Sequence, residues 1–260
     1  MGKNDIQITA KTVDTSSTQV AKTETGPLSG RVKEAKGGEA GAGYHLLLLC
    51  ENMTGYRNLS KLVSIGFKEG FYYKPRIDKE VLADNAEGLI CLSACLKGEV
   101  AYLCERDRIE EAVGVARWYA DLFPDRYYIE LQDHTLPKQR QCNEGLLRIA
   151  RELGLRLLCT NDVHYLTRDD AEAHDVLLCI GTGATTGDAA RLRYEAEEFY
   201  LKSAEQMAEI FRDHPEALAT TVEIAERCNV EIPERGAALP TPECPDGLTP
   251  MEYLRRLAHQ

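Results

Sequence analysis

The 260-residue sequence contains no run of about 20 apolar residues, no secretion signal and no pair of cysteines in a CxxC spacing. The first two absences speak against a membrane-spanning helix and predict a cytoplasmic protein. The nine cysteines are therefore expected to be free thiols, most of them filling the core. The patterns GxxxxGK[ST] and GxSxG are also missing, so a phosphate-binding loop and a serine-hydrolase nucleophile are set aside.

Positive charge is scarce, because 31 Lys and Arg residues stand against 42 Asp and Glu residues, for a net charge of −11. Residues 1–43 hold six basic and five acidic side chains, so residues 44–260 carry a charge of −12. This sign opposes a surface that mainly neutralises nucleic-acid phosphates. Any contact with DNA is expected to be local or to lie outside this chain.

Residues 1–43 lack aromatic residues, histidine and cysteine, and are rich in Thr, Ser, Lys and Gly. Such a segment buries too little apolar surface to offset the entropy of ordering it. We expect 1–43 to be a mostly disordered or aberrant N-terminal segment.

From residue 44 onward, short apolar runs alternate with stretches of helical spacing. The runs span residues 45–50, 89–92, 127–131 and 155–159, and three of the amphipathic patterns span residues 59–66, 109–119 and 146–153. This order predicts an α/β fold of four β/α units with a parallel sheet or barrel. The functional edge of such a sheet is where the strands end.

After residue 195 the pattern becomes helical. A capping box begins at Ser203, and Pro215 suits the first turn of another helix. Five of the ten prolines fall in residues 233–250, which predicts an extended linker before a helix that begins at Thr249 and Pro250.

Potential metal ligands follow these apolar runs. Asp162 and His164 come directly after residues 155–159, where both can point into a barrel mouth, although an Asp there can equally cap the next helix. Cys95 follows residues 89–92 as a potential thiolate ligand, although a buried structural thiol is the commoner role. His134 follows residues 127–131, whereas His45 stands at the start of its strand and fits least well.

Several segments resemble the alpha subunits of bacterial DNA polymerase III. They include YHLLLLCEN (44–52), LSACLKGE (92–99), ELQDH (130–134), TNDVHY (160–165) and DAEAHDVLLCI (170–180). The resemblance covers residues 31–260, and residues 1–30 show none. It implies a polymerase-and-histidinol-phosphatase (PHP) domain, a distorted (β/α)7 barrel with a metal cluster at its mouth. Residues 44–195 would be an incomplete PHP barrel, and residues 196–260 the helical start of the polymerase palm with its Pro-rich linker.

Carried over by this resemblance, the metal ligands are His45, Cys95, Asp162 and His164, with His134 as an additional candidate, and the ion is Zn²⁺ or Mn²⁺. The family's early ligand motifs, beginning with His-x-His, do not occur before His45. About half of the ligands are thus missing. We therefore expect weak metal binding and no exonuclease activity from this chain alone.

The resemblance implies a fragment of a replicative DNA polymerase subunit, with a possible 3′–5′ exonuclease role for intact PHP domains. Its partners would be DNA, deoxynucleoside triphosphates, the sliding clamp and the proofreading exonuclease, with no membrane. The carboxylates that hold Mg²⁺ for polymerisation lie beyond residue 260 in that family, so the catalytic residues are unknown here. Two alternatives stay open: a stand-alone phosphoesterase of the histidinol-phosphatase type and a non-catalytic PHP scaffold.

Overall fold

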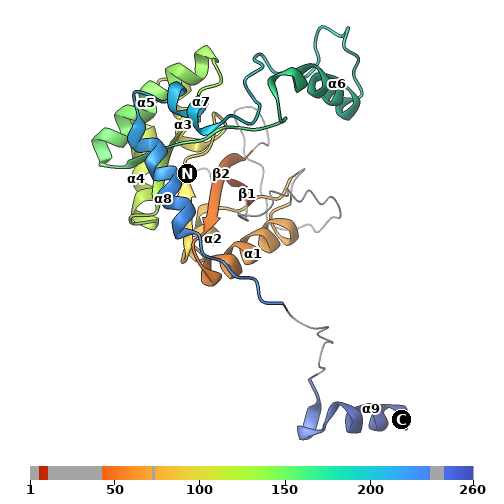
Figure 1. Cartoon of the computed structure of the whole chain (residues 1–260). Helices are drawn as coiled ribbons and strands as arrows, with labels where there is room; N and C mark the ends of the chain where they lie inside the picture. The colour runs from red at the N-terminus through yellow and green to blue at the C-terminus, as the bar shows by residue number, and fades with distance from the viewer. Residues whose placement is uncertain (1–5, 11–42, 72–73, 235–242, 260) are drawn as a thin grey trace. The chain divides into compact units, whose positions relative to one another are not determined.

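The computed structural model describes residues 6–10, 43–71, 74–234 and 243–259 (Figure 1). The chain divides into two compact units, Met1–Val230 and Glu231–Gln260. The first unit holds a sheet and most of the helices. The domain boundary predicted between residues 195 and 196 stays a prediction.

The first unit is built on a five-stranded sheet whose strand order follows the chain. The strands are β1 (Ile6–Ala10), β2 (Tyr44–Cys50), β3 (Leu89–Leu92), β4 (Tyr127–Leu131) and β5 (Arg156–Cys159). The four predicted strands are confirmed to within one residue at each end. The expectation of a purely parallel sheet is wrong, because β2 and β3 pair antiparallel, with Leu47 opposite Leu92, while the other neighbours pair parallel.

Strand β1 lies within the segment predicted to be mostly disordered. Its residues, Ile-Gln-Ile-Thr-Ala, pair parallel with β2 in the register Ile6 to Tyr44. The polar composition of the surrounding sequence hid this short alternating pattern. The rest of 1–42 lies outside the described residues.

The three predicted amphipathic patterns, at residues 59–66, 109–119 and 146–153, all lie within helices of the structure. The helices are α1 (Met53–Lys68), α2 (Lys79–Ala83), α3 (Glu99–Glu105), α4 (Ile109–Leu122), α5 (Pro137–Leu153), α6 (Ala171–Thr182), α7 (Ala204–Ile210), α8 (Pro215–Arg227) and α9 (Pro250–Ala258), with short 3₁₀ turns at Arg168–Asp170 and Pro245–Gly247. Helices α2 and α3 were not predicted. Gly154 ends α5 in the left-handed conformation, and Ser203 caps α7 with the predicted capping box.

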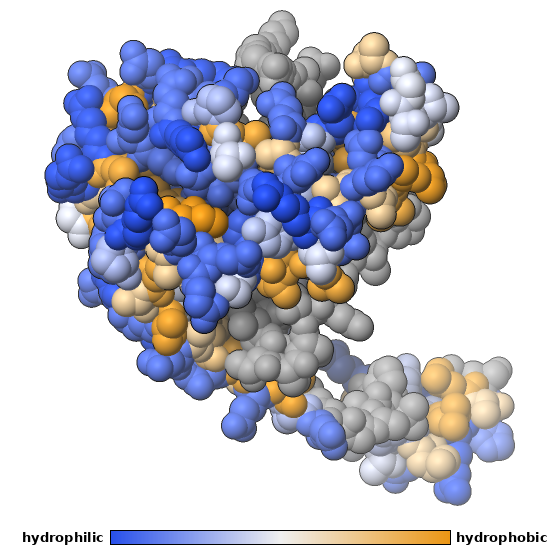
Figure 2. Space-filling view, turned by 45° about the horizontal axis from the view of Figure 1, so that its top comes forward, coloured by the Kyte–Doolittle hydropathy of each residue, from blue (hydrophilic) through white to orange (hydrophobic). Residues whose placement is uncertain are grey.

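The core lies between the sheet and its helices. Strands β3 and β4 are buried along their whole length; β3 is apolar throughout, and β4 is apolar except for Glu130. Helix α8 packs against β5, where the Thr221 hydroxyl donates to the Cys159 carbonyl at 3.1 Å. All nine cysteines are free thiols, and six of them are buried. Figure 2 shows a mostly hydrophilic face with separate hydrophobic patches.

The second unit contains α9, which begins with a capping box between Thr249 and Glu252. The helix start predicted at Thr249 and Pro250 is thus confirmed. Part of the predicted Pro-rich linker, residues 235–242, lies outside the described residues. No helix in the described ranges is both long enough and apolar enough to cross a membrane.

Candidate functional site

The antiparallel pairing of β2 and β3 decides where His45 lies. Because β2 runs opposite to β3, the start of β2 lies at the edge where β3 ends. The His45 N–H donates to the Lys97 carbonyl at 2.9 Å, and His45 Nδ1 lies 3.6 Å from Cys95 Sγ. His45, the poorest candidate by strand position, is therefore beside the thiol that follows β3.

A tight turn after β3 presents Cys95. Ala94 has a φ of +65°, an unfavourable conformation for a residue with a Cβ. The Gly98 N–H donates to the Cys95 carbonyl at 2.7 Å, and a Cβ at Gly98 would lie 2.1 Å from the Ser93 carbonyl oxygen. The turn therefore needs glycine at position 98.

Asp162 and His164 follow β5. His164 Nε2 lies 3.4 Å from Asp162 Oδ1 and 3.1 Å from the Tyr194 hydroxyl. The His164 N–H donates to the Phe199 carbonyl at 2.8 Å. The Asp162 and His164 side chains are 39% and 31% exposed, so both are accessible to a ligand.

His134 is buried next to Asp162 and contacts the loop that carries Asp162 and His164. It is 1% exposed and stacks on Phe199 with ring centroids 4.5 Å apart and planes at 8°. Its Nε2 accepts the Asp162 N–H at 3.2 Å and lies 3.3 Å from Asn161 Oδ1, while its Nδ1 lies 3.3 Å from Gln139 Oε1 and 3.2 Å from Gln139 Nε2. With both nitrogens engaged, His134 positions the Asp162 backbone.

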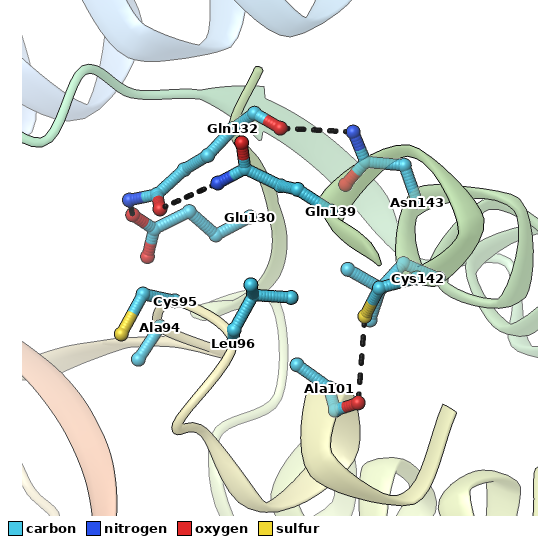
Figure 3. A pocket seen from close by; sticks show the side chains of 10 residues that line it. Ala94, Cys95, Leu96, Ala101, Glu130, Gln132, Gln139, Cys142 and Asn143 are labelled. Atoms are coloured by element: carbon cyan, nitrogen blue, oxygen red, sulfur yellow. Dashed lines mark hydrogen bonds between the residues drawn. The ribbon is translucent and has the colours of Figure 1, made fainter. Parts of the chain in front are cut away.

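A polar network joins the ends of β4 and β5. Glu130 Oε1 accepts hydrogen bonds from Gln132 Nε2, at 3.1 Å, and from the Thr160 hydroxyl. Figure 3 shows Glu130, Gln132 and Gln139 near Cys95, among the residues that line a cavity of about 10 Å³. That volume suffices for about one water molecule.

Burial dominates the electrostatics of the site. Burial, reinforced by Lys97 and Lys74, lowers the pKa of His45, while Asp162 opposes this shift. Burial raises the pKa of the Cys95 thiol, and Asp162 adds to that rise. His45 is thus held neutral, and Asp162 is close enough to act on both partners of the His45–Cys95 pair.

The four predicted ligands thus form two pairs at one edge of the sheet. No three His, Cys, Asp or Glu side chains among the described residues gather closely enough to hold a metal ion. Sequence reasoning missed Tyr194 and Phe199, which contact His164. No local motif marks them, because they come from a loop about 30 residues further along the chain.

Comparison with known proteins finds one matching family model and many similar DNA polymerase III alpha subunits. The PHP domain family model matches residues 8–134. The chain is 49% identical over 219 residues to DNA polymerase III subunit alpha of Treponema pallidum, covering 84% of this chain and 19% of that protein. The subunit of Borreliella burgdorferi is 47% identical over 210 residues, a match that covers 81% of this chain and 18% of that protein. The subunit of Thermus aquaticus is 41% identical over 231 residues, which covers 86% of this chain and 19% of that protein. Most of the chain is thus similar to one region of DNA polymerase III alpha subunits, and residues 8–134 of it match the PHP domain family model.

The chain spans about a fifth of the length of these alpha subunits. The family match begins at residue 8, so the expectation that the resemblance starts at residue 31 is wrong for residues 8–30. The matched residues include the last three residues of β1, His45, Cys95 and His134. Asp162 and His164 lie beyond them, within the region aligned along the alpha subunits.

Proposed function

We propose that this PHP region binds a divalent transition-metal ion through His45, Cys95, Asp162 and His164. One observation carries the proposal, namely the separations within the two pairs, 3.6 Å and 3.4 Å. Two ligands on a tetrahedral zinc ion, with bonds of about 2.0–2.3 Å, lie about 3.4–3.6 Å apart. Nitrogen, sulfur and oxygen donors also suit Zn²⁺.

The two pairs fit an ion separately, but the described residues do not bring them together. Binding requires the partly exposed Asp162 carboxylate to turn toward Cys95 and His45. It also requires the Cys95 thiol, whose pKa is raised by burial, to lose its proton. Both requirements cost free energy, so we expect weak binding that weakens further as pH falls.

A bound ion would activate water and stabilise charge on a phosphodiester. We therefore propose metal-dependent 3′–5′ phosphodiester hydrolysis as the role of this region in a longer subunit with a complete ligand set. For the present chain alone we expect no exonuclease activity. For the whole subunit we propose cytoplasmic DNA-directed DNA synthesis, with DNA and deoxynucleoside triphosphates as substrates. The sliding clamp and the proofreading exonuclease are the proposed partners, and Mg²⁺ would act at carboxylates outside this chain.

Cobalt titration tests the metal site, because Co²⁺ reports thiolate ligation by its absorption spectrum. We expect weak binding with a thiolate charge-transfer band that is lost in Cys95→Ser and at least tenfold weaker affinity in Asp162→Asn. Cys228→Ser is the matched control, because this partly exposed thiol lies at the end of α8. An unchanged Co²⁺ spectrum in Cys95→Ser would contradict the proposed ligand set. Tight stoichiometric zinc with chelator-sensitive nuclease activity would contradict the expected weakness and inactivity.

A further inference from the structure

A second cavity lies beside α6, next to the Asp162–His164 pair. Its volume is about 340 Å³, within the range of small-molecule sites. Three rings line it, those of Tyr165, His174 and Tyr194, and their neighbouring centroids are about 5.2 Å apart. The cavity therefore offers aromatic surface at a place where the proposed chemistry would occur.

Tyr194 links this cavity to the proposed metal site. One side of the residue lines the cavity, and its hydroxyl lies 3.1 Å from His164 Nε2. The His164 and His174 ring centroids are 5.5 Å apart. A molecule in the cavity would thus have one end close to His164.

The walls of the cavity are held in place by contacts on the described chain. Arg191 clamps Asp175 of α6 through two hydrogen bonds, of 2.5 and 2.6 Å. The Leu201 N–H donates to the Tyr165 carbonyl at 3.1 Å, and Phe199 packs edge-on against Tyr194 at 4.5 Å. The aromatic walls are therefore preorganised, which reduces the entropy cost of binding.

The polar lining narrows the chemistry of the ligand. Glu172 and Glu197 are carboxylates that accept hydrogen bonds and repel phosphate, whereas Arg193 supplies a cation on the same lining. Aromatic rings stack on nucleobases, and carboxylates accept hydrogen bonds from exocyclic amino groups. A base that carries an amino group satisfies both features, and its phosphate would remain outside the carboxylate-lined space.

We infer that this cavity binds the amino-bearing base of a terminal nucleotide, with the sugar and phosphate directed toward His164. The orientation rests on the proposed phosphodiester chemistry, but binding of the base itself does not. Cytosine, adenine and guanine carry an exocyclic amino group, whereas thymine offers only its N3–H, which lies between two carbonyl oxygens that a carboxylate repels. The cavity therefore discriminates against thymine.

Nucleoside binding to the full chain, measured by NMR titration in the presence of a chelator, tests this inference without metal or phosphate. We expect deoxycytidine to bind about tenfold more tightly than thymidine, because one hydrogen bond to a charged group is worth about 1.5 kcal/mol or more. The double variant Glu172→Ala/Glu197→Ala should lose that preference. Glu209→Ala, which changes an exposed carboxylate on α7, should retain it.

Equal binding of the two nucleosides to the wild-type chain, or no binding, would overturn the inference without reliance on any variant's folding. A preference that persists in the double variant would overturn it too. Nucleoside binding without Co²⁺ binding would support the base pocket and overturn the proposed metal site. Co²⁺ binding without nucleoside binding would support the proposed metal site and overturn the base pocket.

Discussion

Replacing His134 by phenylalanine tests whether this residue supports the site through its ring nitrogens. His134→Phe keeps a ring to stack on Phe199 but removes the acceptor for the Asp162 N–H and the hydrogen bond between Nδ1 and the Gln139 side chain. A fully buried N–H left without a partner costs about 1–3 kcal/mol, and the low end of that range applies to the part-buried Asp162 N–H; the lost contact with Gln139 costs about 1 kcal/mol more. The free energy of unfolding should therefore fall by about 2 kcal/mol.

Urea unfolding followed by the fluorescence of Trp118, the single tryptophan, measures this change. With a slope of about 2–3 kcal/mol per molar urea, the midpoint should fall by roughly 1 M. His134→Ala should be less stable still, by about another 2 kcal/mol, because it also leaves a cavity against Phe199. In the folded His134→Phe protein, Co²⁺ affinity should also drop, since the Asp162 backbone loses its anchor.

His214→Ala provides the control, because His214 is partly exposed at the start of α8 and contacts Glu216 there. It should change the unfolding free energy by less than about 0.5 kcal/mol. If His134→Phe unfolds at the same urea concentration as the wild-type chain, the ring nitrogens do not support the loop and the positioning role is refuted.

Gly88→Ala should destabilise the chain by about 2 kcal/mol or more in the same urea assay, because Gly88 has a φ of +71° and an added Cβ would lie 2.5 Å from a backbone nitrogen. Gly114→Ala in α4 should instead stabilise the chain by up to about 1 kcal/mol, because an added Cβ there meets nothing within 4 Å. The hydrogen bonds from Arg191 lower the pKa of Asp175 in the folded chain, so the ionised Asp175 stabilises the fold. This stabilisation is fully present above the ordinary pKa of 3.8 and is lost as pH falls through the lower pKa that Asp175 has in the folded chain. Acid titration should therefore destabilise wild type more than Asp175→Asn, and parallel pH curves would argue against the linkage. Burial raises the pKa of Cys159 to about 12, so little reactive thiolate forms in the native chain. Iodoacetamide at pH 8 should therefore label Cys159 slowly in the native chain and rapidly in urea, as measured by mass spectrometry of the peptide that contains it. Equal labelling rates would show that the thiol is not protected.

Much of the local structure follows from sequence alone. Apolar runs of four to six residues became β2 to β5, because buried strands are rich in hydrophobic residues. The capping boxes at Ser203 and Thr249 began the helices expected of them, since capping is a local hydrogen-bonding pattern. Strand β1 escaped detection, because five residues of alternating pattern carry a weak signal within a polar segment.

The sequence by itself determined the strands, most of the helices and the residue types at the candidate site, because these depend on neighbours along the chain. Only the tertiary structure placed His45 beside Cys95, since strand direction depends on how β2 and β3 pair across about 40 residues. Tertiary packing also placed His134 under Asp162 as a support and brought Tyr194 against His164. These contacts join residues far apart in sequence, so no local pattern encodes them.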